Sequence, residues 1–233
     1  MAPGAGGRGL TEGISVIIPA YNESRKIAAT VKAARTIPGV REVIVVDDGS
    51  TDGTGEQARA AGARVITLAC NQGKGKALAR GIAAAKEELI LLLDADLGST
   101  AAQGSLLVKP LLAGTADMTV ASLPPSRTRA GFGLALALAR YGTWLLAGRK
   151  MQAPLSGQRA FRKKALPFLQ PLLPGFGVEV GLNIRAARRG LRVREVPVKM
   201  SHEATGRNLQ GFRHRARQFW HILQALVRLF WEG

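Results

Sequence analysis

Two carboxylates, Asp94 and Asp96, stand one residue apart directly after the apolar run 89–93. The run predicts a buried strand. A regular strand alternates its faces, so both side chains should point the same way off its carboxyl end. In an open α/β sheet that edge is where ligands bind. Two hard oxygen ligands side by side suit Mg²⁺ or Mn²⁺ shared with a diphosphate. For so short a pattern, a pair of solvated turn aspartates is the alternative.

Three other polar loops follow predicted strands in the first half of the chain. They are residues 19–23 (Pro-Ala-Tyr-Asn-Glu), 47–52 (Asp-Asp-Gly-Ser-Thr-Asp) and 71–76 (Asn-Gln-Gly-Lys-Gly-Lys). Each loop alone is typical of a connection that leads into a helix. Together they would place acids, glycines and Lys74 around one crevice. Glycine lets a backbone approach a ligand closely, and a lysine beside a helix N-terminus favours phosphate.

An alternation of strands and helices must position these loops. Apolar runs predict strands at 14–18, 42–46, 64–68, 89–93 and 117–121. Helical spacing predicts helices at 23–35, 52–61, 75–86 and 101–113 between or after them. This order is typical of an α/β fold with a mostly parallel sheet, covered by helices on both faces.

The second half of the chain is less regular. We expect a long helix at 131–149, buried rather than membrane-spanning because Arg140 interrupts its apolar run. A helix at 178–189 precedes Gly190, which suits the position just after a helix C-terminus. Alternation over 191–198 near Pro197 predicts an edge strand, and a final helix covers 212–231.

Positive charge is concentrated in this second half. The net charge is +17, and residues 120–233 hold 20 Lys/Arg against 4 Asp/Glu, whereas residues 1–119 hold 13 against 12. Such a surface favours phosphorylated substrates, anionic lipid or nucleic acid, with solubility alone as the plain alternative. The single cysteine, Cys70, excludes an internal disulfide. No secretory signal precedes the first strand, so we expect a cytoplasmic protein. An alternative location within this prediction is the inner face of the membrane.

The four loops as a set resemble the nucleotide-sugar glycosyltransferases of the GT-A fold, family 2 type, a group that includes dolichyl-phosphate mannose synthase. In the second half, residues 154–161 (Pro-Leu-Ser-Gly-Gln-Arg-Ala-Phe), 175–181 (Gly-Phe-Gly-Val-Glu-Val-Gly) and a histidine near position 200 resemble glucosyl-3-phosphoglycerate synthases. The resemblance implies a Rossmann-like GT-A fold in one domain. Its parts are a disordered lead-in at 1–12, a nucleotide-sugar-binding half at 13–121 and a basic acceptor-binding half at 122–233.

The resemblance also implies roles residue by residue. The nucleotide sugar would be bound by Pro19, Ala20, Tyr21, Glu23, Asp48, Lys74, Asp94 and Ala95. The metal, Mg²⁺ or Mn²⁺, would be held by Asp96 and His202. Catalysis would rest on Asp96, Glu179 and Arg207. The acceptor would lie against Arg127, Arg129, Leu155, Ser156 and Gly157.

Some of these roles have structural alternatives. Asp48 would accept a hydrogen bond from the uracil N3–H. Asp94 would bind the ribose or the water shell of the metal. Arg207 would clamp the diphosphate with its planar fork. Glu179 would bind the donor sugar or the acceptor, and its alternative is a charge at a helix N-terminus. For His202 the alternative is a surface histidine before a turn.

The expected reaction moves a hexose, glucose by the closer resemblance, from a UDP-sugar rather than a GDP-sugar to a phosphate-bearing acceptor. That acceptor is phosphoglycerate-like or a polyprenyl phosphate, and the stereochemical course stays open. A sugar nucleotidyltransferase is the alternative enzyme, although such enzymes open with a Gly-rich loop bearing Arg and Lys. A nucleic-acid binder is the non-enzymatic alternative. It has no use for Asp94 and Asp96, so we expect no nucleic-acid partner.

The final helix offers a second clue about partners. Its apolar residues step by three and four, and arginines fall on the other side. The apolar face is Phe212, Ala216, Phe219, Leu223, Leu226 and Phe230, with Arg213, Arg217 and Arg228 opposite. This pattern predicts a basic amphipathic helix over 212–231. Such a helix lies in a lipid interface as a peripheral membrane contact, or packs on the core or on a second copy in a homodimer.

Overall fold

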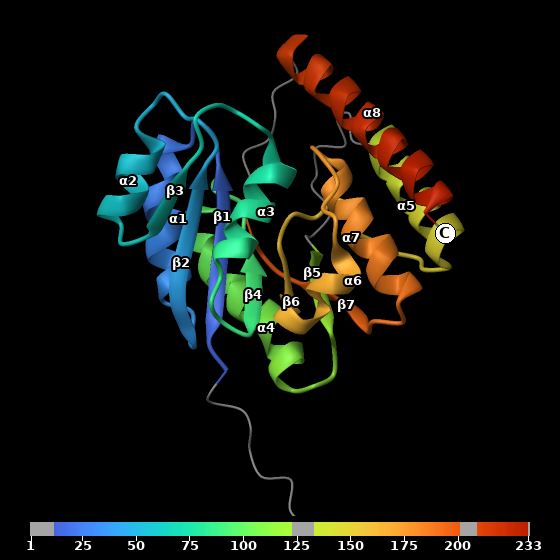
Figure 1. Ribbon diagram of the computed structural model, residues 1–233, viewed down its shortest axis with the longest axis horizontal. Helices are drawn as coiled ribbons and strands as arrows, with labels where there is room; N and C mark the ends of the chain where they lie inside the picture. The colour runs from blue at the N-terminus through green and yellow to red at the C-terminus, as the bar shows by residue number, and fades with distance from the viewer. Residues whose placement is uncertain (1–11, 123–132, 201–208, 233) are drawn as a thin grey trace, which may run out of the picture.

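One mixed sheet of seven strands forms the centre of the molecule (Figure 1). The computed structural model describes residues 12–122, 133–200 and 209–232, with side chains in the last helix from residue 216 onward. The strands are β1 (Ile14–Ala20), β2 (Val40–Asp47), β3 (Arg64–Thr67), β4 (Leu89–Leu92), β5 (Met118–Ser122), β6 (Arg159–Arg162) and β7 (Val193–Pro197). Their order is β3-β2-β1-β4-β6-β5-β7, and only β6 runs antiparallel to its neighbours. The predicted α/β fold is confirmed.

Helices cover both faces of this sheet. They are α1 (Ser24–Arg35), α2 (Thr54–Ala60), α3 (Lys74–Ala84), α4 (Gly104–Leu112), α5 (Gly133–Ala147), α6 (Leu166–Leu169), α7 (Gly177–Arg188) and α8 (Leu209–Trp231), with 3₁₀ turns η1 (Gly98–Gln103) and η2 (Lys163–Ala165). Helices α1, α2 and α4 pack on one face, and α3, α6 and α7 pack on the other. Helices α5 and α8 form an outer layer over α7 (Figure 1).

Strands β1 and β4 are almost entirely apolar because both of their faces are covered. In β1, Val16 and Ile18 face the core under α1, whereas Ile17 faces the core under α3. All four residues of β4 are fully buried. A continuous aliphatic run therefore indicates a central strand here rather than a half-exposed one.

Two local predictions in the second half are confirmed. Gly190 follows α7 with a φ of 68°, and its N–H donates to the carbonyl of Ala187. A left-handed residue at this position closes the helix C-terminus. Strand β7 lies at the edge of the sheet, paired only with β5 among the described residues.

Strand β6 is the element that the sequence pattern did not predict. It lies between β4 and β5 in the sheet. It pairs Arg159 with Leu92 and Ala160 with Leu91 of β4, a strand that is distant from β6 in the sequence. Its four residues begin and end with arginine, so they show no apolar run. The antiparallel register nevertheless matters for function, because it brings the segment before Arg159 beside the residues that follow β4.

Helix α5 corrects the expectation of a buried helix at 131–149. Only a stripe of small residues is buried, and it includes Ala139 and Gly142. A Cβ added at Gly142 would lie 2.4 Å from Leu226 of α8, so the small residue lets the two helices approach closely. Tyr141 and Trp144 point outward, with 59% and 44% of their surface exposed. Among the described residues, no helix is long and apolar enough to cross a bilayer.

Helix α8 corrects the predicted apolar face. Its buried residues include Ile222, Ala225 and Leu229, whereas Phe230 of the predicted face is 61% exposed. Leu226 is the member of that face that is buried. Apolar residues cover most of the circumference of α8, so spacing alone does not decide which side meets the core. Phe212 and Arg213 lie outside the described side chains.

Candidate active site

The loops after β1 and β2 are joined by hydrogen bonds. The Asn22 N–H donates to Ser50 Oγ at 3.0 Å, and the Thr51 N–H donates back to Asn22 Oδ1 at 3.0 Å. The Glu23 N–H donates to Thr54 Oγ1 at 2.8 Å. Asn22 adopts a φ of 54°, a left-handed conformation that asparagine tolerates better than most residues. This exchange holds the predicted nucleotide-binding residues 19–23 against the end of β2.

Asp48 fixes a third loop to the same edge. Its two oxygens accept from the N–H groups of Gln72 and Gly73, each at 2.8 Å, and the residue is 4% exposed. The Asp48 N–H in turn donates to the carbonyl of Ala20 at 2.8 Å. Each carboxylate oxygen keeps a second lone pair, so the predicted contact with uracil stays a prediction.

Lys74, at the start of α3, joins two carboxylates from distant parts of the chain. Its Nζ lies 2.8 Å from Asp94 Oδ1 and 2.9 Å from Glu179 Oε1. Burial alone would lower the pKa of Lys74, but the charges of Asp94 and Glu179 outweigh it and hold the pKa above its usual value. Lys74 therefore stays protonated at neutral pH.

Glu179 is the carboxylate of this cluster whose two oxygens differ in their surroundings. It sits in the first turn of α7 and is 4% exposed. Its Oε1 pairs with Lys74, but its Oε2 is buried and has no hydrogen-bond partner among the described residues. A buried acceptor without a donor costs free energy unless a ligand supplies one. A hydroxyl or N–H of a bound molecule is the group that Oε2 lacks.

Gly157 lies where any side chain would enter the cluster. A Cβ added there would lie 2.6 Å from Lys74 Nζ and 2.7 Å from Asp94 Oδ1. The cause is the register of β6: Arg159 pairs with Leu92, so two residues further along Gly157 meets Asp94. Glycine is required here for close approach, whereas the resemblance implied only that Gly157 lines the acceptor.

Gln158 and Arg159 complete the cluster, and the sequence did not single them out. Gln158 Nε2 donates to Asp94 Oδ2 at 2.5 Å, and Ser156 Oγ donates to Gln158 Oε1 at 3.1 Å. Asp94 is therefore held from both sides, by Lys74 and by Gln158. Both new residues occur within the quoted segment 154–161, but no spacing marks them as functional.

Arg159 is fully buried behind Glu179. Its guanidinium donates to the carbonyls of Ser156 and Glu179 and to Asn183 Oδ1. Burial lowers the pKa of Arg159 to about 10, while the charges of Glu179 and Asp94 oppose that change. Arg159 stays charged at neutral pH, so the site holds one buried cation, Arg159, and one partly buried cation, Lys74, facing two carboxylates.

The family assignment follows from comparison with known proteins. The chain matches the family model described as Glycosyl transferase family 2 over residues 15–166. The chain belongs to glycosyl transferase family 2. Its fold is the GT-A fold of the solved members described below, and it is a glycosyltransferase rather than a nucleotidyltransferase.

Three relatives illustrate the range of this family. Protein MJ1222 of Methanocaldococcus jannaschii is 33% identical over 201 residues, which cover 80% of each chain. Glycosyltransferase AglJ of Haloferax volcanii is 29% identical and covers 80% of this chain and 62% of its own length. Glucosyl-3-phosphoglycerate synthase of Mycobacterium tuberculosis is 34% identical over 194 residues, 73% of this chain and 60% of the synthase. The chain thus spans less than two thirds of the two relatives with named activities.

Solved structures of the mycobacterial synthase are similar over nearly the whole chain. A complex with phosphoglyceric acid has a TM-score of 0.80 at 29% identity and covers 94% of this chain and 80% of that one. A complex with Mn²⁺, UDP-glucose and phosphoglyceric acid has a TM-score of 0.77 at 30% identity, covering 93% and 80%. Another complex of the synthase holds Mg²⁺ and UDP.

The residues of this glycosyltransferase fit a divalent cation near Asp96. Strand β4 ends at Leu92, so Asp94 and Asp96 lie in the turn after it, not in the strand itself. Exposure still alternates, because both aspartates are half-buried while Ala95 between them is buried. The oxygens of Asp94 are engaged by Lys74 and Gln158, and direct ligation of the cation by Asp96 stays a prediction from the resemblance.

The number of acidic ligands also fits such a cation. Within the described ranges, no group of three or more His, Cys, Asp or Glu is placed so that it could hold a metal ion by itself. Mg²⁺ is typically held by one or two carboxylates together with substrate phosphates and water, so the aspartates suffice.

The structure brings together most but not all of the predicted site. Pro19, Ala20, Tyr21 and Glu23 lie in or directly after β1, at the same sheet edge as Asp48, Lys74 and Asp94. Ser156 is buried beside Gln158, whereas Leu155 is half-buried and packs on the core between α5, α7 and α8. Predicted residues outside the described part of the chain are Arg127, Arg129, His202 and Arg207.

Proposed function

We propose that this glycosyltransferase moves a hexose from a UDP-sugar to a phosphate-bearing acceptor with the help of Mg²⁺ or Mn²⁺. The observation that carries the proposal is the Lys74–Asp94–Glu179 cluster at the carboxyl edge of the sheet, in which Glu179 Oε2 has no partner within the described part of the chain. The similar mycobacterial synthase binds UDP-glucose, Mn²⁺ and phosphoglyceric acid, which supports the same classes of ligand here. Glucose is the donor sugar that we favour.

Each part of the cluster has a proposed task. The loops 19–23 and 48–52, which are joined by hydrogen bonds, bind the nucleoside. Asp48 faces the base and Glu23 faces the ribose. Asp96 holds the cation, which supplies positive charge for the departing diphosphate when it is bound. Glu179 Oε2 accepts a hydrogen bond from a hydroxyl of the transferred sugar or of the acceptor. Lys74 fixes the position of that carboxylate and remains cationic beside the diphosphate.

A phosphate-bearing acceptor suits the remaining chemistry. An ionised phosphate oxygen is already a nucleophile, so it needs no general base, whereas a hydroxyl acceptor needs one. Glu179 is the buried carboxylate of the cluster that we propose would serve a hydroxyl. The acceptor is phosphoglycerate-like or a polyprenyl phosphate, placed by Ser156 and Gly157, with Arg127, Arg129 and Arg207 as the proposed phosphate clamps and His202 as a second metal ligand.

A donor screen tests the proposal before any acceptor is known. The protein is incubated with UDP- and GDP-sugars and Mn²⁺ or Mg²⁺, and released nucleotide is measured. We expect release of UDP from UDP-glucose above that from GDP-sugars, and none with a chelator. Equal release from every donor, or release that persists in EDTA, would contradict the proposal.

A further inference from the structure

Exposed tryptophan is concentrated on the outer layer of the molecule. The chain has three tryptophans, and Trp144, Trp220 and Trp231 are exposed by 44%, 56% and 80%. Tyr141 lies beside Trp144 with ring centroids 5.7 Å apart, and Phe230 lies beside Trp231 at 5.5 Å. Large aromatic side chains are normally mostly buried, so their joint exposure on two packed helices marks an interaction surface.

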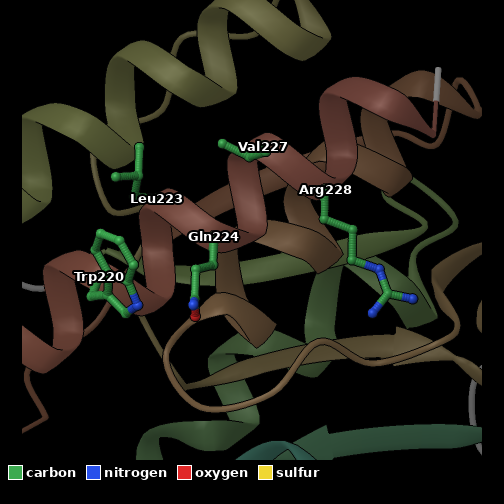
Figure 2. A pocket seen from close by; sticks show the side chains of 5 residues that line it. All are labelled: Trp220, Leu223, Gln224, Val227 and Arg228. Carbon is green, nitrogen blue, oxygen red and sulfur yellow. The ribbon is translucent and has the colours of Figure 1, made fainter.

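We name this surface the α5–α8 face and define it by six residues: Tyr141, Trp144, Trp220, Val227, Phe230 and Trp231. Figure 2 shows the α8 part, a shallow groove with Trp220 at one end and Arg228 at the other. Helix α8 is already anchored on its opposite side, where Ile222, Ala225 and Leu229 are buried. The exposed side chains are therefore not required to fasten the helix to the core.

The charge around this face is positive. Arg217 and Arg228 are exposed on α8, and Arg140 is exposed on α5. Among the described acids of the second half, Glu179 is buried and Glu195 accepts from backbone N–H groups of the 152–153 loop. Glu232 pairs with Arg185 and Arg228 and offsets part of their charge, so the positive charge of the face rests mainly on Arg217 and Arg140.

Charge and chemistry together select the partner. A second copy of a chain with a net charge of +17 would bring like charges together, which opposes association through this face. Anionic lipid headgroups complement the arginines instead. Tryptophan and tyrosine combine an apolar ring with a polar N–H or O–H, which suits the boundary between headgroups and acyl chains.

We propose that the α5–α8 face binds the surface of an anionic lipid bilayer, with its aromatic side chains in the headgroup region. The binding is peripheral, because the face is a single side of two helices that otherwise pack on the protein. This inference concerns where the enzyme works. It is tested independently of the proposed sugar transfer, because vesicle binding is measured without turnover.

Vesicle binding by the full chain tests the inference. Phosphatidylcholine vesicles are compared with vesicles that also contain phosphatidylglycerol, and bound protein is measured by co-sedimentation. We expect binding to the anionic vesicles that weakens as salt is raised. Because every tryptophan of the chain lies on the face, brominated lipid should quench the intrinsic fluorescence directly.

Matched variants separate this face from the general charge of the protein. Trp220→Ala combined with Trp231→Ala should lower vesicle partition by on the order of tenfold or more, with unchanged circular dichroism. Val227→Glu tests the same face without removing an aromatic ring. Phe168→Ala is the control, because Phe168 is 45% exposed but lies on α6, outside the face. It should bind like the wild type.

Four outcomes would overturn the inference. The first is that the protein does not bind anionic vesicles at low salt. The second is that the Phe168→Ala control loses as much binding as the tryptophan variant. A third is a stable dimer without lipid that Trp220→Ala dissociates, because the face would then belong to a second copy. The last is duplex DNA binding that the tryptophan variant abolishes, which would assign the face to nucleic acid.

Discussion

Lys74 Nζ lies 2.9 Å from Glu179 Oε1, and the other oxygen of Glu179 is buried without a hydrogen-bond partner among the described residues. One oxygen is thus fixed by a cation while the other is left to accept from outside the protein. This asymmetry supports the proposed binding role of Glu179, because a buried acceptor without a donor costs free energy unless a ligand supplies one.

Glu179→Gln tests the use of that oxygen. The substitution keeps the shape of the side chain but removes its charge, so the hydrogen bond to a bound sugar weakens. We expect kcat/KM for UDP-glucose to fall by about 10- to 100-fold, the range for hydrogen bonds to charged groups. UDP lacks the sugar, so its affinity, measured by calorimetry, should change little. An unchanged kcat/KM would show that Oε2 meets neither sugar nor acceptor.

Lys74→Met tests the electrostatic balance of the cluster. Without the ammonium group, Asp94 and Glu179 lose the cation that both of them contact directly, and Glu179 is buried. We expect the free energy of unfolding to fall by about 2–3 kcal/mol, less than for a fully buried pair because Lys74 is about a quarter exposed. Urea denaturation measures the change.

A second variant completes that test. In the double variant Lys74→Met, Glu179→Gln the uncompensated charge is smaller, so part of the lost stability should return. Strictly additive losses would show that Lys74 and Glu179 do not interact.

Gly157→Ala tests the close approach of β6 to the turn after β4. The new methyl group would lie 2.6 Å from Lys74 Nζ and must displace it or Asp94. A shift of about 1 Å in a positioned group costs on the order of a hundredfold in rate, and we expect a loss of that size. Gly133→Ala is the matched control, since a methyl group there meets nothing within 4 Å. Equal activity of the two variants would contradict the geometry.

Asp52 gives the fold a defined sensitivity to acid. Slight burial raises the pKa of Asp52, but hydrogen bonds from Thr54 and Ser24 outweigh it and lower the pKa to about 2 from 3.8. The unfolded chain therefore binds this proton more readily, so stability rises with pH through this window.

The stability that Asp52 contributes should be complete above the unfolded pKa of 3.8 and lost as the pH falls toward 2. The effect is modest because the side chain is exposed to solvent. Unfolding of the wild type and of Asp52→Asn, compared across pH, measures it. A difference between the two proteins that does not shrink in acid would exclude this role.

Several features of the fold could be predicted because local patterns determine them. The aliphatic run 89–93 indicated a strand covered on both faces, and Gly190 indicated the end of a helix; both are present, the strand over Leu89–Leu92. Strand β6 could not be predicted, because its pairing with β4 depends on contacts between segments about 70 residues apart. The orientation of α8 was missed since its apolar residues surround most of the helix.

The same division holds for the site. Lys74, Asp94 and Glu179 were expected from their types and from the resemblance, and the structure brings them together. Gln158 and Arg159 were not expected, because their roles arise from the register of β6 rather than from any local motif. A buried arginine has no signature in a sequence rich in surface arginines.

Calorimetric binding of UDP with and without Mn²⁺, in the wild type and in Asp96→Asn, tests the central claim most directly. The account predicts tighter binding of UDP by the wild type when Mn²⁺ is present, an effect that EDTA abolishes. It predicts that Asp96→Asn folds normally, as judged by its thermal unfolding, but loses the dependence on Mn²⁺. Binding of UDP that is equally tight in EDTA, or an Asp96→Asn variant that retains the full effect of Mn²⁺, would contradict it.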